Sequence, residues 1–162
     1  MMNTGNLQLT TQGDREIVIT RTFDASRTLV FDAFTKPELV KRWLIGPPGW
    51  SMPVCEIDLR VGGAYRYVWR SVEGREMGMC GVYREILAPK RIVATEKFDD
   101  PWYPGEALVT IALSEQGERT TLKQTILYET REARDRVLQS PMEKGLTASY
   151  VRLAELLAAA EK

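Results

Sequence analysis

The feature that most constrains the fold is one long amphipathic helix that follows a series of short strands. The apolar stripe of this helix consists of Met142, Leu146, Tyr150, Leu153 and Leu157. Ser140, which precedes a proline and stands three residues before a glutamate, has the form of a helix N-cap. Because one helix cannot bury an apolar stripe by itself, we expect this helix to pack on one face of a sheet.

The residues before the helix supply that sheet. A first strand is predicted at 15–23, two short helices follow within 26–43, and a loop rich in proline and glycine covers 44–50. Six further strands are predicted at 54–59, 64–70, 76–87, 91–98, 107–114 and 120–128. Their short spacing is typical of an antiparallel meander. We therefore predict an α+β fold, with a curved antiparallel sheet of about seven strands wrapped around the long C-terminal helix.

The length of the chain fits one domain. With 162 residues it can bury a core of its own. Residues 1–14 are polar and predict a flexible N-terminal tail, which leaves 15–162 as a single domain. The tail lacks the apolar segment of a secretory leader, and no run approaches the ~20 apolar residues that cross a bilayer. We therefore expect a cytoplasmic protein without a membrane span, in which Cys55 and Cys80 are free thiols.

Charge and composition exclude several functions. The 22 basic and 22 acidic residues balance, which argues against nucleic acid as a partner. The chain contains no histidine, so a Ser-His-Asp or Cys-His catalytic machine cannot form. No nucleophile motif, phosphate loop or metal-binding spacing is present. We predict no cofactor, no metal and no catalytic residue, and favour binding over catalysis.

A row of aromatic residues is the strongest indication of a binding site. Tyr65, Tyr67 and Trp69 alternate with polar or smaller residues, so the period of a strand places all three on one face. We expect this face to lie opposite the helix stripe of Met142, Leu146 and Tyr150. The three rings would then form a wall for an apolar or aromatic ligand. Ordinary core packing explains the same pattern equally well.

Other candidates lie around this row. Trp43, Trp50 and Trp102 stand at or beside loops and suggest a lid or an entrance, although loops pinned onto the body give the same pattern. Met79 lies at strand spacing and suits an adaptable wall or a core gap. Glu96 shares the parity of apolar neighbours and becomes an acid or base in the cavity if that face points inward. A solvent-facing Glu96, or one paired with an arginine, is the alternative.

Four segments carry a family resemblance: 23–43, 58–65, 81–92 and 150–157. Their order and spacing resemble the START-like helix-grip superfamily (SRPBCC), in its branch named after the activator of heat-shock protein 90 ATPase. The resemblance implies the helix-grip fold over nearly the whole chain from about residue 15. One departure is Gly145-Leu146, where the family often has Gly-Trp, and it changes the shape of the pocket mouth.

The resemblance leaves three functions open, since fold alone does not settle function. The first is a binding domain for a small hydrophobic or aromatic molecule, held between sheet and helix. The second is a co-chaperone-like activator of the heat-shock protein 90 ATPase, with that chaperone as partner. The third is a cyclase or hydrolase that acts in the same cavity. A homodimer stays open as well.

Overall fold

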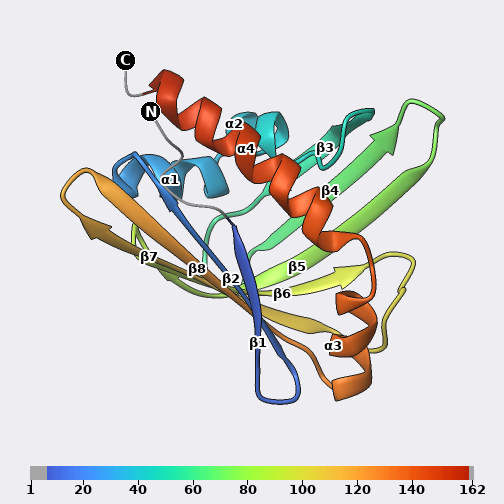
Figure 1. Cartoon of the computed structure of the whole chain (residues 1–162). Helices are drawn as coiled ribbons and strands as arrows, with labels where there is room; N and C mark the ends of the chain where they lie inside the picture. Colours follow the sequence, from blue (N-terminus) through green and yellow to red (C-terminus); the bar gives the residue numbers. More distant parts are fainter. Residues whose placement is uncertain (1–6, 161–162) are drawn as a thin grey trace.

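The computed structural model describes residues 7–160, which form one sheet and four helices (Figure 1). The strands are β1 (Gln8–Gln12), β2 (Glu16–Phe23), β3 (Trp50–Ile57), β4 (Ala64–Ser71), β5 (Glu76–Leu87), β6 (Arg91–Phe98), β7 (Ala107–Gln116) and β8 (Arg119–Leu127). The helices are α1 (Arg27–Thr35), α2 (Pro37–Trp43), α3 (Arg131–Leu138) and α4 (Met142–Ala160).

The sheet is antiparallel throughout and has the strand order β1-β2-β8-β7-β6-β5-β4-β3. The run from β3 to β8 is a meander, and β2 joins it by pairing with β8. The sheet curves around α4, while α1 and α2 cover the end of the molecule where α4 finishes (Figure 1). This arrangement confirms the predicted α+β helix-grip fold.

The strand β1 corrects the prediction of a flexible tail over 1–14. Gln8–Gln12 pairs with β2 and adds an eighth strand to the predicted seven. A turn at Gly13, whose φ of 59° favours glycine, joins the two strands. The segment is polar because it is an edge strand with mostly exposed side chains, and only Leu7 and Leu9 reach the core. The remaining tail residues, 1–6, lie outside the described part of the chain.

The apolar stripe of α4 divides into two halves. Tyr150, Leu153 and Leu157 are at most 2% exposed and form the centre of the core. Leu146 and Met142, one and two turns before Tyr150, are only partly buried. The first half of α4 is therefore less tightly packed against the rest of the protein than the second half. Among residues 7–160, no helix combines the length and apolar character that a membrane crossing requires.

Candidate functional site

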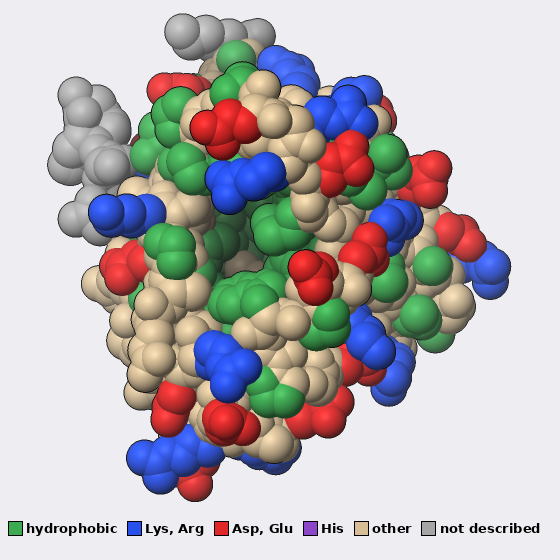
Figure 2. All heavy atoms as spheres, turned by 90° about the vertical axis from the view of Figure 1, so that its right-hand side faces the viewer, with side chains coloured by type: hydrophobic (Ala, Val, Ile, Leu, Met, Phe, Trp, Pro, Cys, Tyr) green, Lys and Arg blue, Asp and Glu red, His purple; other side chains and the backbone are tan. Residues whose placement is uncertain are grey.

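The site is a cavity of about 250 Å³ between the concave face of the sheet and the first half of α4. Strands β4 to β8 supply its wall, and Met142 and Leu146 lie on the helix side. The face of the molecule shown in Figure 2 is hollowed, with hydrophobic side chains inside the opening and charged side chains around it. The sheet curvature and the two halves of the α4 stripe together leave this space unfilled.

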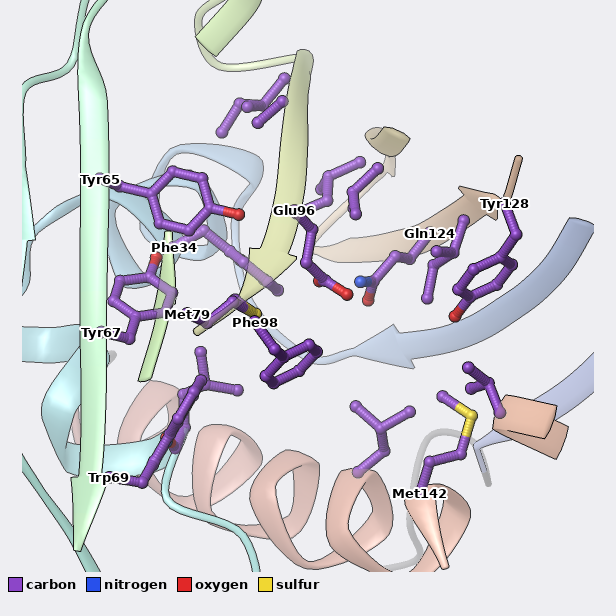
Figure 3. A pocket seen from close by; sticks show the side chains of 18 of the residues that line it. Phe34, Tyr65, Tyr67, Trp69, Met79, Glu96, Phe98, Gln124, Tyr128 and Met142 are labelled. Atoms are coloured by element: carbon purple, nitrogen blue, oxygen red, sulfur yellow. The ribbon is translucent and has the colours of Figure 1, made fainter. Parts of the chain in front are cut away.

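The predicted aromatic row lies on the cavity wall. Tyr65, Tyr67 and Trp69 all point from β4 into the cavity, with neighbouring ring centroids 5.0 and 5.8 Å apart (Figure 3). The hydroxyl of Tyr65 donates to the carbonyl of Thr95 at 2.7 Å, and the Trp69 indole donates to the carbonyl of Leu44 at 2.7 Å. These bonds hold the rings of Tyr65 and Trp69 in place. Their contact with a ligand stays a prediction.

Glu96 points from β6 into the same cavity, among its parity neighbours Ile92, Ala94 and Phe98 (Figure 3). The alternative of a residue on the outer surface is therefore wrong. Its carboxylate accepts a hydrogen bond of 3.3 Å from the hydroxyl of Tyr103. Burial raises the pKa of Glu96 to about 7, against which this hydrogen bond acts weakly. The side chain of Glu96 is partly exposed, and it lines the hollow.

A carboxyl group with a pKa near 7 has two chemical uses. It can exchange a proton close to neutral pH, or it can act as a hydrogen-bond acceptor and counter-charge for a guest. Within residues 7–160, no three histidine, cysteine or acidic side chains gather into a metal-binding set. Cys55 and Cys80 are both free thiols, and burial raises the pKa of Cys55 to about 11.

One polar residue of the cavity wall, Gln124, was not predicted from the sequence. Gln124 lies on β8 between the buried Leu122 and Ile126, and its side-chain oxygen accepts a 2.7 Å hydrogen bond from the hydroxyl of Tyr150. The amide nitrogen is left facing the side of Glu96 (Figure 3). A polar residue with the parity of buried apolar neighbours was the signal that could have revealed Gln124.

A cluster of aromatic rings adjoins Glu96. It consists of Phe98, Trp102, Tyr103 and Tyr128, whose neighbouring centroids are 5.1 to 6.1 Å apart in edge-to-face contacts. All four line the cavity. Tyr103 and Trp102 come from the irregular segment between β6 and β7, where no periodicity indicates which side chains turn inward. Tyr83 also lines the cavity, from β5.

The tryptophans predicted at a lid or entrance occupy three different places. Trp43 is 1% exposed, and its indole donates to the carbonyl of Ala33 at 2.9 Å, so it forms the inner floor rather than the mouth. Trp50 lies outside the cavity, where its ring packs under the guanidinium of Arg75 at 5.7 Å. It begins the edge strand β3 and lines a second hollow of the surface. Trp102 borders both hollows.

The other predicted residues, Met79, Met142, Leu146 and Tyr150, all line the cavity. Tyr150 also belongs to the core, where its ring lies 6.0 Å from Phe23 and 5.7 Å from Trp43. Tyr150 thus belongs both to the cavity lining and to the core. The sequence placed these side chains on the correct faces of their elements.

The model of the family described as Activator of Hsp90 ATPase homolog 1-like protein matches residues 24–158. None of the curated proteins matches the chain. A crystal structure of a Rhodobacter sphaeroides protein is 32% identical, with a TM-score of 0.90, and the match covers 95% of this chain and 99% of that one.

Two further solved structures show the breadth of the fold. A Chromobacterium violaceum protein is 28% identical, with a TM-score of 0.75 and coverage of 88% of this chain and 96% of that one. An HSP90 activator from Plasmodium falciparum is 23% identical, with a TM-score of 0.61 and coverage of 86% and 96%. At that identity, the second likeness shows the fold alone.

Proposed function

The chain belongs to the family of Activator of Hsp90 ATPase homolog 1-like proteins, and from this premise we propose that it binds a small, largely apolar molecule in its cavity. One observation carries the proposal. The first half of the α4 stripe faces an aromatic wall across about 250 Å³ of unfilled space. Ligand sites are typically concave and mostly apolar, with a few polar groups that orient the guest.

The energetics support a use for this space. Side chains that line an unfilled hollow lose dispersion contacts, so a domain selected for stability alone gains by filling it. Here large rings border the hollow, and the hydrogen bonds of Tyr65 and Trp69 to backbone carbonyls hold two of them in place. A preformed wall of this kind lowers the cost of ordering side chains around a guest.

The volume favours a small guest. Ligand pockets usually span about 300–1,000 Å³, so a cavity of about 250 Å³ lies just below that range. A one- or two-ring aromatic molecule suits this space better than a long-chain lipid. Such a guest can stack against Tyr67 and Trp69 while its other face touches Leu146.

Filling the mouth should abolish binding. Leu146→Trp places an indole in the half of α4 that lines the cavity, and we expect saturable binding of 1-naphthalenemethanol, measured by isothermal titration calorimetry, to be lost. The matched control is Val151→Trp, which adds the same ring to an exposed position of α4 and should leave the affinity unchanged. Equal binding by wild type and Leu146→Trp would contradict the proposed location.

The second candidate is a co-chaperone, favoured by the likeness to the Plasmodium falciparum HSP90 activator. That likeness concerns the fold, so this candidate ranks below ligand binding. A direct test adds the purified protein in equimolar amount to heat-shock protein 90 and measures ATP hydrolysis. We expect an unchanged rate, because the proposed activity lies in the cavity. A several-fold rise that Leu146→Trp retains would establish the co-chaperone function instead.

A further inference from the structure

We propose that the guest of this cavity carries a protonated amine, which pairs with the Glu96 carboxylate while its apolar body lies against Trp69 and Leu146. The inference rests on the proposed function and names its ligand class. It comes from three observations on the cavity: the distribution of charge, the rings beside Glu96 and the unfilled hydrogen-bonding capacity of its carboxylate.

The described residues that line the cavity include an acidic side chain but no basic one. Among the described residues that line it, Glu96 is the one side chain that is acidic or basic enough to carry charge near neutral pH. The titratable groups that face it are Tyr65 and Tyr67 from β4, Tyr103 from the segment after β6, and Tyr128 from the end of β8. Burial raises the pKa of each phenol, so all four stay neutral.

The helix side adds no counter-charge. α4 contributes Met142, Leu146 and the phenol of Tyr150 to the lining, and burial raises the pKa of that phenol too. An anionic guest would therefore meet a carboxylate and no cation among the described lining residues, since the buried Arg21 beside Tyr150 does not line the cavity. A cationic guest would supply the counter-charge that the lining lacks, and a buried charge is tolerated only when it is paired.

The rings next to Glu96 also suit a cation. Tyr103 lies 5.1 Å from Trp102 and 5.2 Å from Tyr128, measured between ring centroids, and Phe98 lies 5.6 Å from Trp102. Ring faces attract ammonium groups within about 6 Å, most strongly when water is excluded. A carboxylate flanked by several aromatic rings is therefore a favourable setting for an amine head group.

The carboxylate of Glu96 has unused accepting capacity. It accepts one hydrogen bond from the described residues, from the Tyr103 hydroxyl, and at 3.3 Å this bond is long. An ionised carboxylate offers about four acceptor positions. Gln124, whose oxygen accepts from Tyr150, presents its amide nitrogen to the same space and adds no charge to it (Figure 3). An ammonium group, with its three donors, completes this arrangement.

Three matched ligands test the proposal: 1-naphthylmethylamine, 1-naphthalenemethanol and 1-naphthoate. They share one bicyclic body and differ in the charge of the head group. By calorimetry at pH 8, where Glu96 is mostly ionised, we expect the amine to bind about tenfold or more tightly than the alcohol, and naphthoate to bind most weakly. In Glu96→Gln the preference for the amine over the alcohol should vanish.

The control variant is Glu106→Gln. Glu106 is exposed on the segment before β7, so its removal changes the same net charge without touching the cavity, and the amine preference should persist. Persistence of the preference in Glu96→Gln would overturn the proposal. Binding of the alcohol with no preference for the amine would overturn it too, while leaving the proposed function intact. Failure of all three ligands to bind would overturn both.

Proton release gives a readout that needs no variant. At pH 6.5 a substantial fraction of Glu96 is protonated, and an ammonium guest should lower its pKa and expel that proton. Binding enthalpies of the amine should then differ between two buffers of unequal ionisation enthalpy, whereas those of the alcohol should agree. The same enthalpy for the amine in both buffers would contradict pairing with Glu96.

Discussion

Replacing Trp43 with alanine should lower the free energy of unfolding by about 3–5 kcal/mol, the largest single-residue effect that we expect in this protein. The indole is 1% exposed and packs against Phe34 and Tyr150, with ring centroids 4.9 and 5.7 Å away. Its nitrogen donates to the carbonyl of Ala33 at 2.9 Å, so the substitution also leaves a buried acceptor unpaired. Urea unfolding followed by circular dichroism measures the loss.

Trp50 supplies the matched control. The same substitution there removes a half-buried ring, over which the guanidinium of Arg75 lies at 5.7 Å. We expect Trp50→Ala to cost less than about 1 kcal/mol, because contacts on the surface contribute little. Equal losses for the two variants would show that Trp43 is not the core residue described above.

Replacing Glu96 with glutamine should stabilise the protein above neutral pH, by up to about 3 kcal/mol. Burial raises the pKa of Glu96 from 4.5 to about 7. Between these values the folded state binds a proton that the unfolded state has released. The free energy of unfolding of the wild type therefore falls as the pH rises from 4.5 to 7, and it stays at the lower level above 7. Glutamine keeps the oxygen that accepts from Tyr103 and carries no such cost.

Denaturant unfolding at several pH values tests this effect. We expect the curves of wild type and Glu96→Gln to converge near pH 4.5 and to separate progressively up to about pH 7. The exposed Glu106→Gln serves as control and should follow the wild type at every pH. A constant difference between Glu96→Gln and wild type across this range would rule out a buried carboxyl with a raised pKa.

Strands that end at turn-forming or strand-breaking residues were predictable from the sequence. β5 and β6 have the predicted bounds, because alternating residues there end at a turn with Pro89 and at the Asp-Asp-Pro segment from Asp99. The parity of Tyr65, Tyr67 and Trp69 correctly placed them on one inward face. β1 was missed because a polar edge strand lacks the alternation of a half-buried one.

The site was only partly predictable, for physical reasons. Periodicity tells which face of a strand a residue occupies, so it places Glu96 and could have placed Gln124. It says nothing about Tyr103, which comes from an irregular segment, or about Trp50, whose surroundings depend on an edge strand. Whether a cavity remains at all depends on how far α4 stands from the sheet at Met142 and Leu146, which local sequence does not determine. A homodimer and a cytoplasmic location stay predictions.

The most direct test of the central claim is methyl NMR of the methionines during titration with 1-naphthalenemethanol. Met79 and Met142 line the cavity from the sheet side and the helix side, whereas Met77, two residues from Met79, lines the second hollow and not the cavity. We predict saturable shifts of the Met79 and Met142 methyl signals, with one dissociation constant, and an unchanged Met77 signal. Shifts confined to Met77, or no saturable shift of either cavity methionine, would contradict binding in the cavity.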